Sequence, residues 1–472
     1  MTPPQRNEDD RPIAALLAPD LLALLDESPS SVSAETEEMH PADLADVTAA
    51  MPRDRVIAFL DALPAERAAE VLSYLDEELR IEVLEAMSAT QAAALVVEMT
   101  PDDRADVLEE LEAEVADDIL DEMPREEREE TEQLQRYDPY TAGGLMTTEF
   151  VSTTENTTAE EALAGVRLVA RSGRQEAMHA IYVTDEQGAL RGVLSLRELL
   201  AAPEREPLRD LSHSDVLSVT PSASQEDVAR VFEKYDLVAV PVVDERRRIL
   251  GVVTVDDVID VIQEEQTEDV QKLGGMEALD EPYITIGLPA VIRKRVGWLC
   301  VLFLGSLLTA TVIERFESQL SKAALLMLFI PLIVSSGGNS GSQATSLIIR
   351  AMALNEISLR DWMRVAGREL VSGLALGGVL GALGFARVMV WQGMGWYDYG
   401  RHHTRVAVTI GVTLLGVVTF GSLAGSMLPF VLRRAGFDPA SASAPFVATL
   451  VDVTGLVIYF TVAALLLSGT LL

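Results

Sequence analysis

The sequence predicts a multi-domain chain: an all-α superhelical N-domain, an α/β domain made of two similar units, and an α-helical transmembrane domain of five helices. Three observations predict it. A hydrophobic repeat of 12 residues occupies the first quarter of the chain, a second repeat with an offset of 59 residues follows, and five long apolar stretches fill the remainder.

Charge is unevenly distributed along the chain. The 472 residues carry a formal net charge of −37, yet from Tyr283 onward 14 basic residues outnumber 8 acidic ones. An acidic surface of this size repels itself unless cations gather on it, and it argues against nucleic acid as a partner. The single cysteine, Cys300, excludes a disulfide within the chain.

The first 38 residues are rich in Ser, Glu and Asp, and we expect them to be a disordered acidic extension. The opening sequence, MTPPQRNEDD, lacks the charged-then-apolar pattern of a secretion signal. We therefore expect this end of the chain to stay in the cytoplasm.

Residues 39–136 repeat with a period of 12. A Met or Leu recurs at this spacing, and most repeats continue with a turn or capping residue, as in MPRDR, LPAER and MTPDDR. The recurring positions are Met39, Met51, Leu63, Leu75, Met87, Met99, Leu111 and Met123. Each repeat predicts one short helix with an apolar face, and stacked helices of this kind form a solenoid. On the period alone, a scaffold that binds another protein is the alternative.

Residues 181–199 and 240–258 form the second repeat. They read IYVTDEQGALRGVLSLREL and VPVVDERRRILGVVTVDDV, and each predicts a strand, a turn with an aspartate, another strand and a helix start. The aligned pairs are Asp185 with Asp244, Gly192 with Gly251, Ser195 with Thr254, and Glu198 with Asp257. The two units resemble a tandem of cystathionine-β-synthase (CBS) domains, expected over residues 137–203 and 204–257.

The CBS resemblance raises the question of a bound nucleotide. In that family a Ser/Thr-x-x-Asp element holds an adenosine ribose, which the resemblance places at Thr254 and Asp257. In the first unit Glu198 takes the place of this aspartate, and its side chain is longer by one methylene group. Arg197 is a further candidate for binding ATP, whereas Ala180 stands where an aromatic ring is expected. A purely structural CBS pair is the alternative, and the sequence leaves both open.

An acidic connecting helix is predicted within residues 258–283. The sequence VDDVIDVIQEEQTEDVQKL begins at Val255 and ends before two glycines that stop a helix. Asp257, Asp260 and Glu264 fall on one face, where like charges destabilise an isolated helix by a few tenths of a kcal/mol per pair. A multivalent cation would relieve this repulsion. A helix that merely faces solvent is the alternative.

Five stretches are long and apolar enough to cross a membrane, which takes about 20 helical residues. They cover residues 296–313, 323–349, 370–386, 406–432 and 439–472. Basic residues gather before the first stretch, between the second and third, and between the fourth and fifth. The positive-inside rule therefore predicts a multi-pass protein of the cytoplasmic membrane, surrounded by lipid, with cytoplasmic N-terminal domains and its C-terminus outside.

Polar residues inside these stretches indicate an ion path through the transmembrane domain, residues 284–472. Asp452 is the carboxylate of the fifth stretch, and burying it near the bilayer centre costs roughly 2.5–3.5 kcal/mol. No Lys or Arg of that stretch can pair with it, so a passing cation is the natural partner. The second stretch carries SSGGNSGSQATS from Ser335, which is poorly suited to face lipid. Close helix packing is the alternative for these small residues.

The available ligands indicate the class of ion. Oxygen ligands suit hard cations such as magnesium and calcium, and magnesium can be held through its hydration shell. One carboxylate per chain predicts a pore shared by two chains. A transporter of another divalent cation, such as Co²⁺ or Mn²⁺, is an alternative, and so is a membrane-tethered CBS-domain signalling scaffold. A negatively charged pore argues against anions, and no nucleophile–base pair supports an enzyme.

Together these features resemble the MgtE family of magnesium transporters over essentially the whole chain. The most specific pieces are GGNSGSQ in the second stretch, DPASASAPFVATLVDVTG in the fifth, and the acidic connecting sequence. The resemblance implies a homodimeric, magnesium-selective channel of the bacterial cytoplasmic membrane. It also implies regulatory magnesium bound between the soluble domains, which locks the connecting "plug" helix over a closed pore, and it links the CBS pair to ATP.

The resemblance also implies roles for individual residues. The pore positions are Asp452, Asn339, Gly338 and Pro445. The magnesium positions on the plug helix are Asp257, Asp260, Glu265, Glu268 and Asp269. The magnesium positions elsewhere in the soluble half are Glu226, Asp236, Asp102, Asp106 and Glu70.

Overall fold

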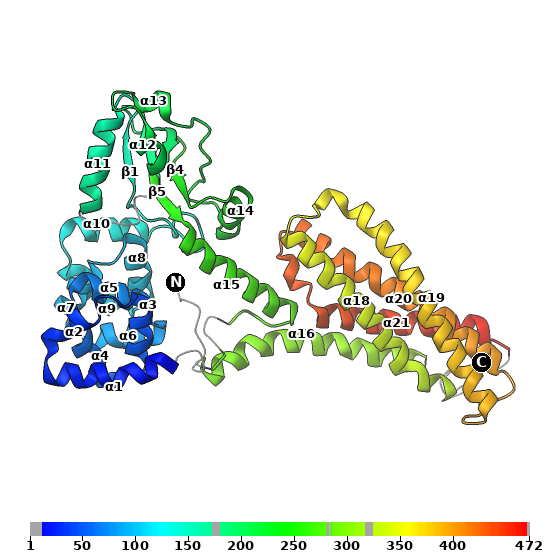
Figure 1. Cartoon of the computed structure of the whole chain (residues 1–472). Helices are drawn as coiled ribbons and strands as arrows, with labels where there is room; N and C mark the ends of the chain where they lie inside the picture. Colours follow the sequence, from blue (N-terminus) through cyan, green and yellow to red (C-terminus); the bar gives the residue numbers. More distant parts are fainter. Residues whose placement is uncertain (1–11, 172–179, 280–282, 285, 317–323, 470–472) are drawn as a thin grey trace. The chain divides into compact units, whose positions relative to one another are not determined.

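The computed structural model describes residues 12–171, 180–279, 283–284, 286–316 and 324–469 (Figure 1). The chain divides into two compact units, Met1–Glu265 and Gln266–Leu472, and each is described by itself. The first unit holds the short helices and the strands. The second holds the long apolar helices.

Short helices follow one another through the first part of the first unit. Each helix from α3 to α10 begins two residues after one of the recurring Met or Leu residues, which therefore occupies the turn before it. The bounds are α3 (Pro41–Ala49), α4 (Arg53–Leu60), α5 (Ala65–Ser73), α6 (Glu77–Ala86), α7 (Ala89–Val96), α8 (Pro101–Glu110), α9 (Ala113–Glu122) and α10 (Arg125–Leu134). All eight recurring residues belong to or pack against one apolar core. The predicted solenoid is confirmed.

The N-terminal extension differs from its prediction. Instead of being disordered, residues 12–38 contain helices α1 (Pro12–Glu27) and α2 (Pro29–Glu35). Residues 1–11 of the predicted extension lie outside the described residues. Leu25 and Val32 are buried in the core of the solenoid. The prediction was wrong because composition hid a local apolar run, LLAPDLLALL, whose burial offsets the cost of ordering the backbone.

The α/β part contains two small sheets. In the first, β1 (Val151–Thr154) pairs parallel with β2 (Ile181–Thr184), which pairs antiparallel with β3 (Leu190–Leu194). In the second, β4 (Ala239–Val243) pairs antiparallel with β5 (Ile249–Thr254). The helices of this part are α11 (Ala159–Arg171), α12 (Leu196–Ala201), α13 (Leu208–Leu211) and α14 (Gln225–Tyr235).

The two turns between paired strands confirm the alignment at an offset of 59 residues. Asp185 accepts hydrogen bonds from the backbone N–H groups of Gln187 and Ala189, two and four residues later. Asp244 accepts the two equivalent bonds in the second unit. In both turns the second carboxylate oxygen accepts a bond from an arginine side chain. The same local chemistry therefore shapes both CBS units.

Helix α15 (Val255–Leu273) follows β5 directly. Val258 and Val261 are buried in one apolar cluster with Val228 of α14. The helix ends before Gly275, whose φ of 76° is a left-handed conformation that glycine adopts without steric cost. The predicted connecting helix and its glycine stop are both present.

Five helices in the described residues are long and apolar enough to cross a membrane. They are α16 (Leu288–Arg315), α18 (Ile330–Ala353), α19 (Trp362–Met394), α20 (His403–Arg434) and α21 (Ala444–Leu467). Short 3₁₀ turns precede three of them, η3 (Ala324–Phe329), η4 (Leu359–Asp361) and η5 (Pro439–Ser441). Helices α18, α20 and α21 pack on one another, α19 packs on α20, and α16 on α21 (Figure 1). The five predicted stretches are confirmed.

Small residues bring α18 and α20 into close contact. A Cβ atom added at Gly421 would collide with the backbone of Gly337, and one added at Gly425 would collide with Gly341. The hydroxyl of Thr345 donates to the carbonyl oxygen of Gly425 at 2.9 Å. Part of the polar segment in α18 therefore serves helix packing, as the alternative interpretation of its small residues expected.

Candidate functional site

Asp452 lies about two turns into α21, on the side that meets α18. The residue is half-buried, and its Oδ1 atom lies 3.7 Å from the position that a Cβ on Gly338 would occupy. The missing side chain at Gly338 therefore leaves room beside the carboxylate. Among the residues the structure describes, no ion pair or hydrogen bond is formed by this carboxylate. A desolvated charge of this kind attracts a cation.

The other predicted pore residues lie along the same pair of helices. Asn339 is exposed on α18, where its Nδ2 atom donates to the hydroxyl of Ser335 at 3.4 Å. Pro445 is half-buried in the first turn of α21. The hydroxyl of Ser342 donates to the carbonyl oxygen of Ala444 at 3.1 Å and ties α18 to the start of α21. The structure thus brings Gly338 and Asp452 together and places Asn339 and Pro445 on the flanks of their contact.

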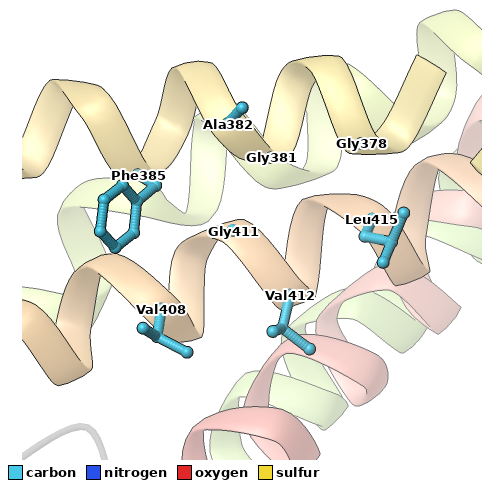
Figure 2. Close-up of a pocket in the computed structure, with 8 residues that line it drawn as sticks. All are labelled: Gly378, Gly381, Ala382, Phe385, Val408, Gly411, Val412 and Leu415. Carbon is cyan, nitrogen blue, oxygen red and sulfur yellow. The ribbon is translucent and has the colours of Figure 1, made fainter. Parts of the chain in front are cut away.

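A hollow of about 280 Å³ lies elsewhere in this unit, between α19 and α20 (Figure 2). Its lining consists of Gly378, Gly381, Ala382, Phe385, Val408, Gly411, Val412 and Leu415. None of these side chains carries an oxygen or nitrogen, so an ion entering the hollow would lose its hydration without gaining ligands. This apolar groove is therefore not a cation path.

The end of α15 is joined to the segment between α20 and α21. The Nζ atom of Lys272 lies 2.8 Å from Oδ2 of Asp438 and 2.5 Å from Oε1 of Glu268. Burial lowers the pKa of Lys272, but the hydrogen bonds to these two carboxylates more than compensate and leave it raised. Leu273 packs against an apolar cluster that contains Ile349 of α18 and Ala440. Glu268, a predicted magnesium position, is here engaged by a lysine.

Carboxylates of α8 and α15 adjoin within the first unit. Ala105 of α8 belongs to the same apolar cluster as Val258 of α15, so the two helices meet at this cluster. Asp102 is buried. The pKa of Asp257 is raised well above its usual range by burial first, and then by the negative charge of Asp102. The structure therefore brings these two predicted positions together.

Two more predicted positions lie on the same two helices, Asp106 on α8 and Asp260 on α15, and we call Asp102, Asp106, Asp257 and Asp260 together the acidic cluster. Burial, with a smaller contribution from Asp103, raises the pKa of Asp106 to about 6. Burial also raises the pKa of Asp260. In the described residues no three acidic, His or Cys side chains already form a group that could hold a metal. Magnesium keeps several of its waters and binds through one or two carboxylates, so paired residues fit it.

The remaining predicted positions are dispersed. Glu265 accepts a hydrogen bond from the buried Gln225 at 2.7 Å. Glu226 forms an ion pair with Arg230. Asp236 ends α14 in a left-handed conformation, ten residues from Glu226 and therefore roughly 15 Å along the helix. Glu226 and Asp236 cannot share one ion within this chain.

Two further predicted positions stand apart from the acidic cluster. Glu70 is half-exposed, with Oε2 3.9 Å from a nitrogen of Arg67, and burial raises its pKa despite that neighbour. Asp269 is half-buried near the end of α15. The charges that act on Glu70 come from residues that are not predicted magnesium positions, whereas Asp269 directly follows Glu268 on α15.

The candidate nucleotide residues form hydroxyl–carboxylate pairs in both CBS units. The hydroxyl of Ser195 donates to Glu198 at 2.6 Å, and His213 contacts the other oxygen of Glu198 at 2.9 Å. The Ser195 hydroxyl first, and then His213, lower the pKa of Glu198 to about 2. The hydroxyl of Thr254 donates to Asp257 at 2.7 Å. A ribose would have to replace these internal bonds.

Comparison with known proteins finds three families along the chain. One described as a divalent cation transporter, MgtE, matches residues 330–462, and the MgtE intracellular N domain matches residues 39–140. The CBS domain matches residues 142–205 and 208–264. The magnesium transporter MgtE of Thermus thermophilus is 42% identical over 437 residues, which is 92% of this chain and 94% of that protein. This chain belongs to the MgtE family.

A second curated relative agrees with this assignment. The magnesium transporter MgtE of Enterococcus faecalis is 36% identical over 340 residues, which is 72% of each chain. A crystal structure of the soluble part of a magnesium transporter is 29% identical, with a TM-score of 0.50 over 53% of this chain and 99% of that chain. The cytosolic domain of the Mg²⁺ channel MgtE in complex with ATP is 37% identical, with a TM-score of 0.48 over 52% of this chain and 99% of that one.

The sequence did not indicate three partners of the predicted site residues. Lys272 engages Glu268 and Asp438, Gln225 engages Glu265, and His213 engages Glu198. Lys272 was detectable as the basic residue of an otherwise acidic plug helix, a pattern that favours a salt bridge. The other two contacts join residues 15 and 40 positions apart, and nothing local in the sequence indicates them.

The raised pKa of Asp106 predicts a pH dependence for the acidic cluster. Its folded pKa of about 6 exceeds the usual 3.8, so assembly of α8 against its neighbours costs free energy above pH 6 and costs progressively less as the pH falls towards 4. In metal-free buffer, we expect amides of α8 to exchange hydrogen about fourfold more slowly at pH 5.5 than at pH 7.5, after correction for intrinsic rates. Unchanged or faster exchange would contradict the account.

Proposed function

We propose that this MgtE-family chain is a magnesium-selective channel of the cytoplasmic membrane, closed by cytosolic magnesium that binds its acidic soluble domains. The observation that carries the proposal is Asp452, a half-buried carboxylate in a membrane-crossing helix that faces a glycine instead of a cationic partner. Such a residue is costly unless it serves a cation.

Magnesium as the transported ion is supported by the ligands and by the relatives. The curated relatives are named magnesium transporters, and the matched family is described as a divalent cation transporter. One carboxylate and one amide per chain are few ligands for a bare ion. A hydrated magnesium ion between the Asp452 carboxylates of two chains satisfies this count, so we propose a homodimer with one shared pore.

The orientation follows from basic residues at the helix ends. Arg350, Arg360 and Arg433 lie at the end of the bundle where α18 meets α19 and where α20 ends. The plug helix also contacts this end, through Lys272 and Asp438. We therefore place this end, and the soluble half that leads to it, in the cytoplasm. The start of α20 then lies outside.

The gate depends on the acidic cluster. At low cytosolic magnesium, the carboxylates of α8 and α15 repel one another; burial first, and then the charge of Asp102, raise the pKa of Asp257. At high magnesium, ions bridge them and hold α15 in place. A ligand shifts such an equilibrium only by the difference between its affinities for the two states. A change from mostly open to mostly closed requires a difference in binding free energy of roughly 5.5 kcal/mol. Several weak sites acting together supply that energy.

The ion pair between Lys272 and Asp438 predicts a way to weaken the closed state without removing any carboxylate. We expect Lys272→Met to require several-fold more cytosolic magnesium for half-inhibition of flux, because it removes a charge-assisted bond of 2.8 Å that holds the plug helix. Magnesium titration of flux measures this shift. Arg434→Met, a change of charge on an exposed residue nearby, should leave the midpoint unchanged. An unshifted midpoint in Lys272→Met would sink the proposed role of this pair.

An adenine nucleotide at the CBS pair is a second regulatory ligand that we propose. It is supported by the hydroxyl–carboxylate pairs that recur in both units and by the exposed Arg197 beside one of them. We expect calorimetry with ATP to give a saturable heat that Thr254→Val reduces at least tenfold, since the hydroxyl cannot then bond a ribose. No saturable heat with the parent protein would retire this proposal.

The substrate is tested by flux into proteoliposomes that contain the purified full-length protein. We expect magnesium uptake that Co²⁺ and Mn²⁺ inhibit by competition only at higher concentrations. Equal or faster uptake of Co²⁺ or Mn²⁺ would assign the chain to another divalent cation. No uptake of any divalent cation would favour the signalling scaffold.

A further inference from the structure

A polar cavity of about 390 Å³ lies at the end of the second unit where α18 turns into α19 and where α20 ends. It is lined by Asn355, Ile357, Ser358, Leu359, Arg360 and Arg433. Two guanidinium groups from segments more than 70 residues apart thus line one hollow. None of these residues belongs to the candidate ion path or to the acidic cluster.

The walls of the cavity are fixed by local structure. Asn355 has a φ of 53°, the left-handed conformation that reverses the chain after a helix. Ser358 and Asp361 then form a capping box, with Ser358 Oγ 2.7 Å from Asp361 Oδ2. Ile357 packs against an apolar cluster that includes Phe430 of α20. The turn that carries Arg360 is therefore held beside the end of α20 that carries Arg433.

The charge in the cavity is not neutralised by the chain itself. Neither Arg360 nor Arg433 forms an ion pair or side-chain hydrogen bond within the described parts of the structure. The nearest acidic residue in the turn, Asp361, already accepts bonds from Ser358 and Arg364. A guanidinium group binds phosphate through two parallel N–H···O bonds, and two of them line this cavity. The cavity therefore suits a phosphate-bearing anion.

The surroundings of the cavity decide between a lipid and a free anion. Four large apolar side chains close in sequence to the lining residues are exposed to solvent. They are Trp362 (48% exposed), Met363 (68%), Val431 (60%) and Phe437 (65%). Trp and other apolar side chains at the ends of membrane-crossing helices mark the interface between hydrocarbon and headgroups. Basic pockets between helix ends at this depth bind lipid headgroups.

We propose that the cavity between Arg360 and Arg433 binds the phosphate of an anionic phospholipid, with the acyl chains lying against the exposed apolar residues beside it. The lipid lies in the leaflet on the side of the plug helix, since Asp438, the partner of Lys272, follows Arg433 by five residues. The proposal is independent of which ion the channel carries.

Native mass spectrometry of the full-length protein in detergent tests this, with titration of phosphatidylglycerol or phosphatidylcholine. We expect saturable retention of phosphatidylglycerol and little retention of phosphatidylcholine. Arg360→Gln/Arg433→Gln should weaken phosphatidylglycerol binding by about 30-fold, because each arginine near an anionic lipid contributes about 1 kcal/mol of attraction. The matched control is Arg350→Gln/Arg434→Gln, which removes two exposed charges at the same end outside the cavity and should lower affinity by no more than about threefold.

Three outcomes would overturn the assignment. One is equal phosphatidylglycerol binding by the parent and the cavity variant, and another is an equal loss in the matched control. The third is competition by inorganic phosphate at the concentration of the lipid, which would identify a free anion as the ligand. Circular dichroism of each variant shows whether it is folded, and Arg360→Lys/Arg433→Lys, which keeps the charge, should retain part of the binding.

Discussion

Replacing Asp452 by alanine is expected to lower magnesium flux by at least 100-fold in a dimer that still assembles. Two unit charges 4 Å apart attract by about 4 kcal/mol at an effective dielectric constant of 20, so loss of the carboxylate removes the main attraction for a cation inside the membrane. The neighbouring Gly338 leaves the carboxylate accessible.

Asp452→Asn separates charge from packing, because asparagine keeps the shape of the side chain. We expect it to be nearly as damaging as alanine. Glu314→Gln serves as the control, since Glu314 is an exposed carboxylate near the end of α16 and should be replaceable without loss of flux. Radioactive or fluorescent magnesium uptake into proteoliposomes measures all three variants. Normal conduction by Asp452→Asn would show that Asp452 is a packing residue.

The second large effect is expected from Asp102→Asn combined with Asp257→Asn. The substitutions remove the repulsion between carboxylates that opens the gate, and they also remove the carboxylates that magnesium bridges. These two changes have opposite effects on the closed state. Loss of repulsion alone favours closure, whereas loss of bridging removes the magnesium dependence. We therefore expect a flattened response, in which flux falls by less than about half across a magnesium range that closes the parent more than tenfold.

The matched control for this variant is Asp117→Asn/Asp118→Asn, which removes two exposed carboxylates from α9, away from the α8–α15 contact. It should keep the magnesium inhibition curve of the parent, because closure depends on the carboxylates of the acidic cluster and not on the total negative charge of the soluble domains. A full parental curve in Asp102→Asn/Asp257→Asn would show that the acidic cluster is only a solvated surface.

The elements most accessible to sequence reasoning were those with a strict period. Leu63 and Leu75 occupy equivalent turns because a repeating residue fixes where each helix begins, and Asp185 and Asp244 form equivalent turns because one side chain satisfies the local backbone. Apolar length alone located the five long helices. Such features depend on residues close in sequence.

Contacts between distant segments were less accessible. The acidic character of α15 was evident, but its encounter with Asp102 depends on how α8 packs against it around Ala105. Helix α1 is ordered because it packs against a core formed by helices that lie later in the sequence. The cavity at Arg360 forms only when α20 ends beside the turn after α18, and no spacing in the sequence indicates that. Tertiary packing decides these features.

The most direct test of the central claim is magnesium flux through the purified full-length protein in proteoliposomes, with magnesium varied on the side of the soluble domains and the driving gradient held constant. We expect rapid flux at low magnesium on that side and a steep fall, of at least tenfold, as the magnesium concentration rises into the millimolar range of weak oxygen-ligand sites. Flux that stays constant over this range, in a protein that otherwise conducts magnesium, would contradict gating by the acidic cluster.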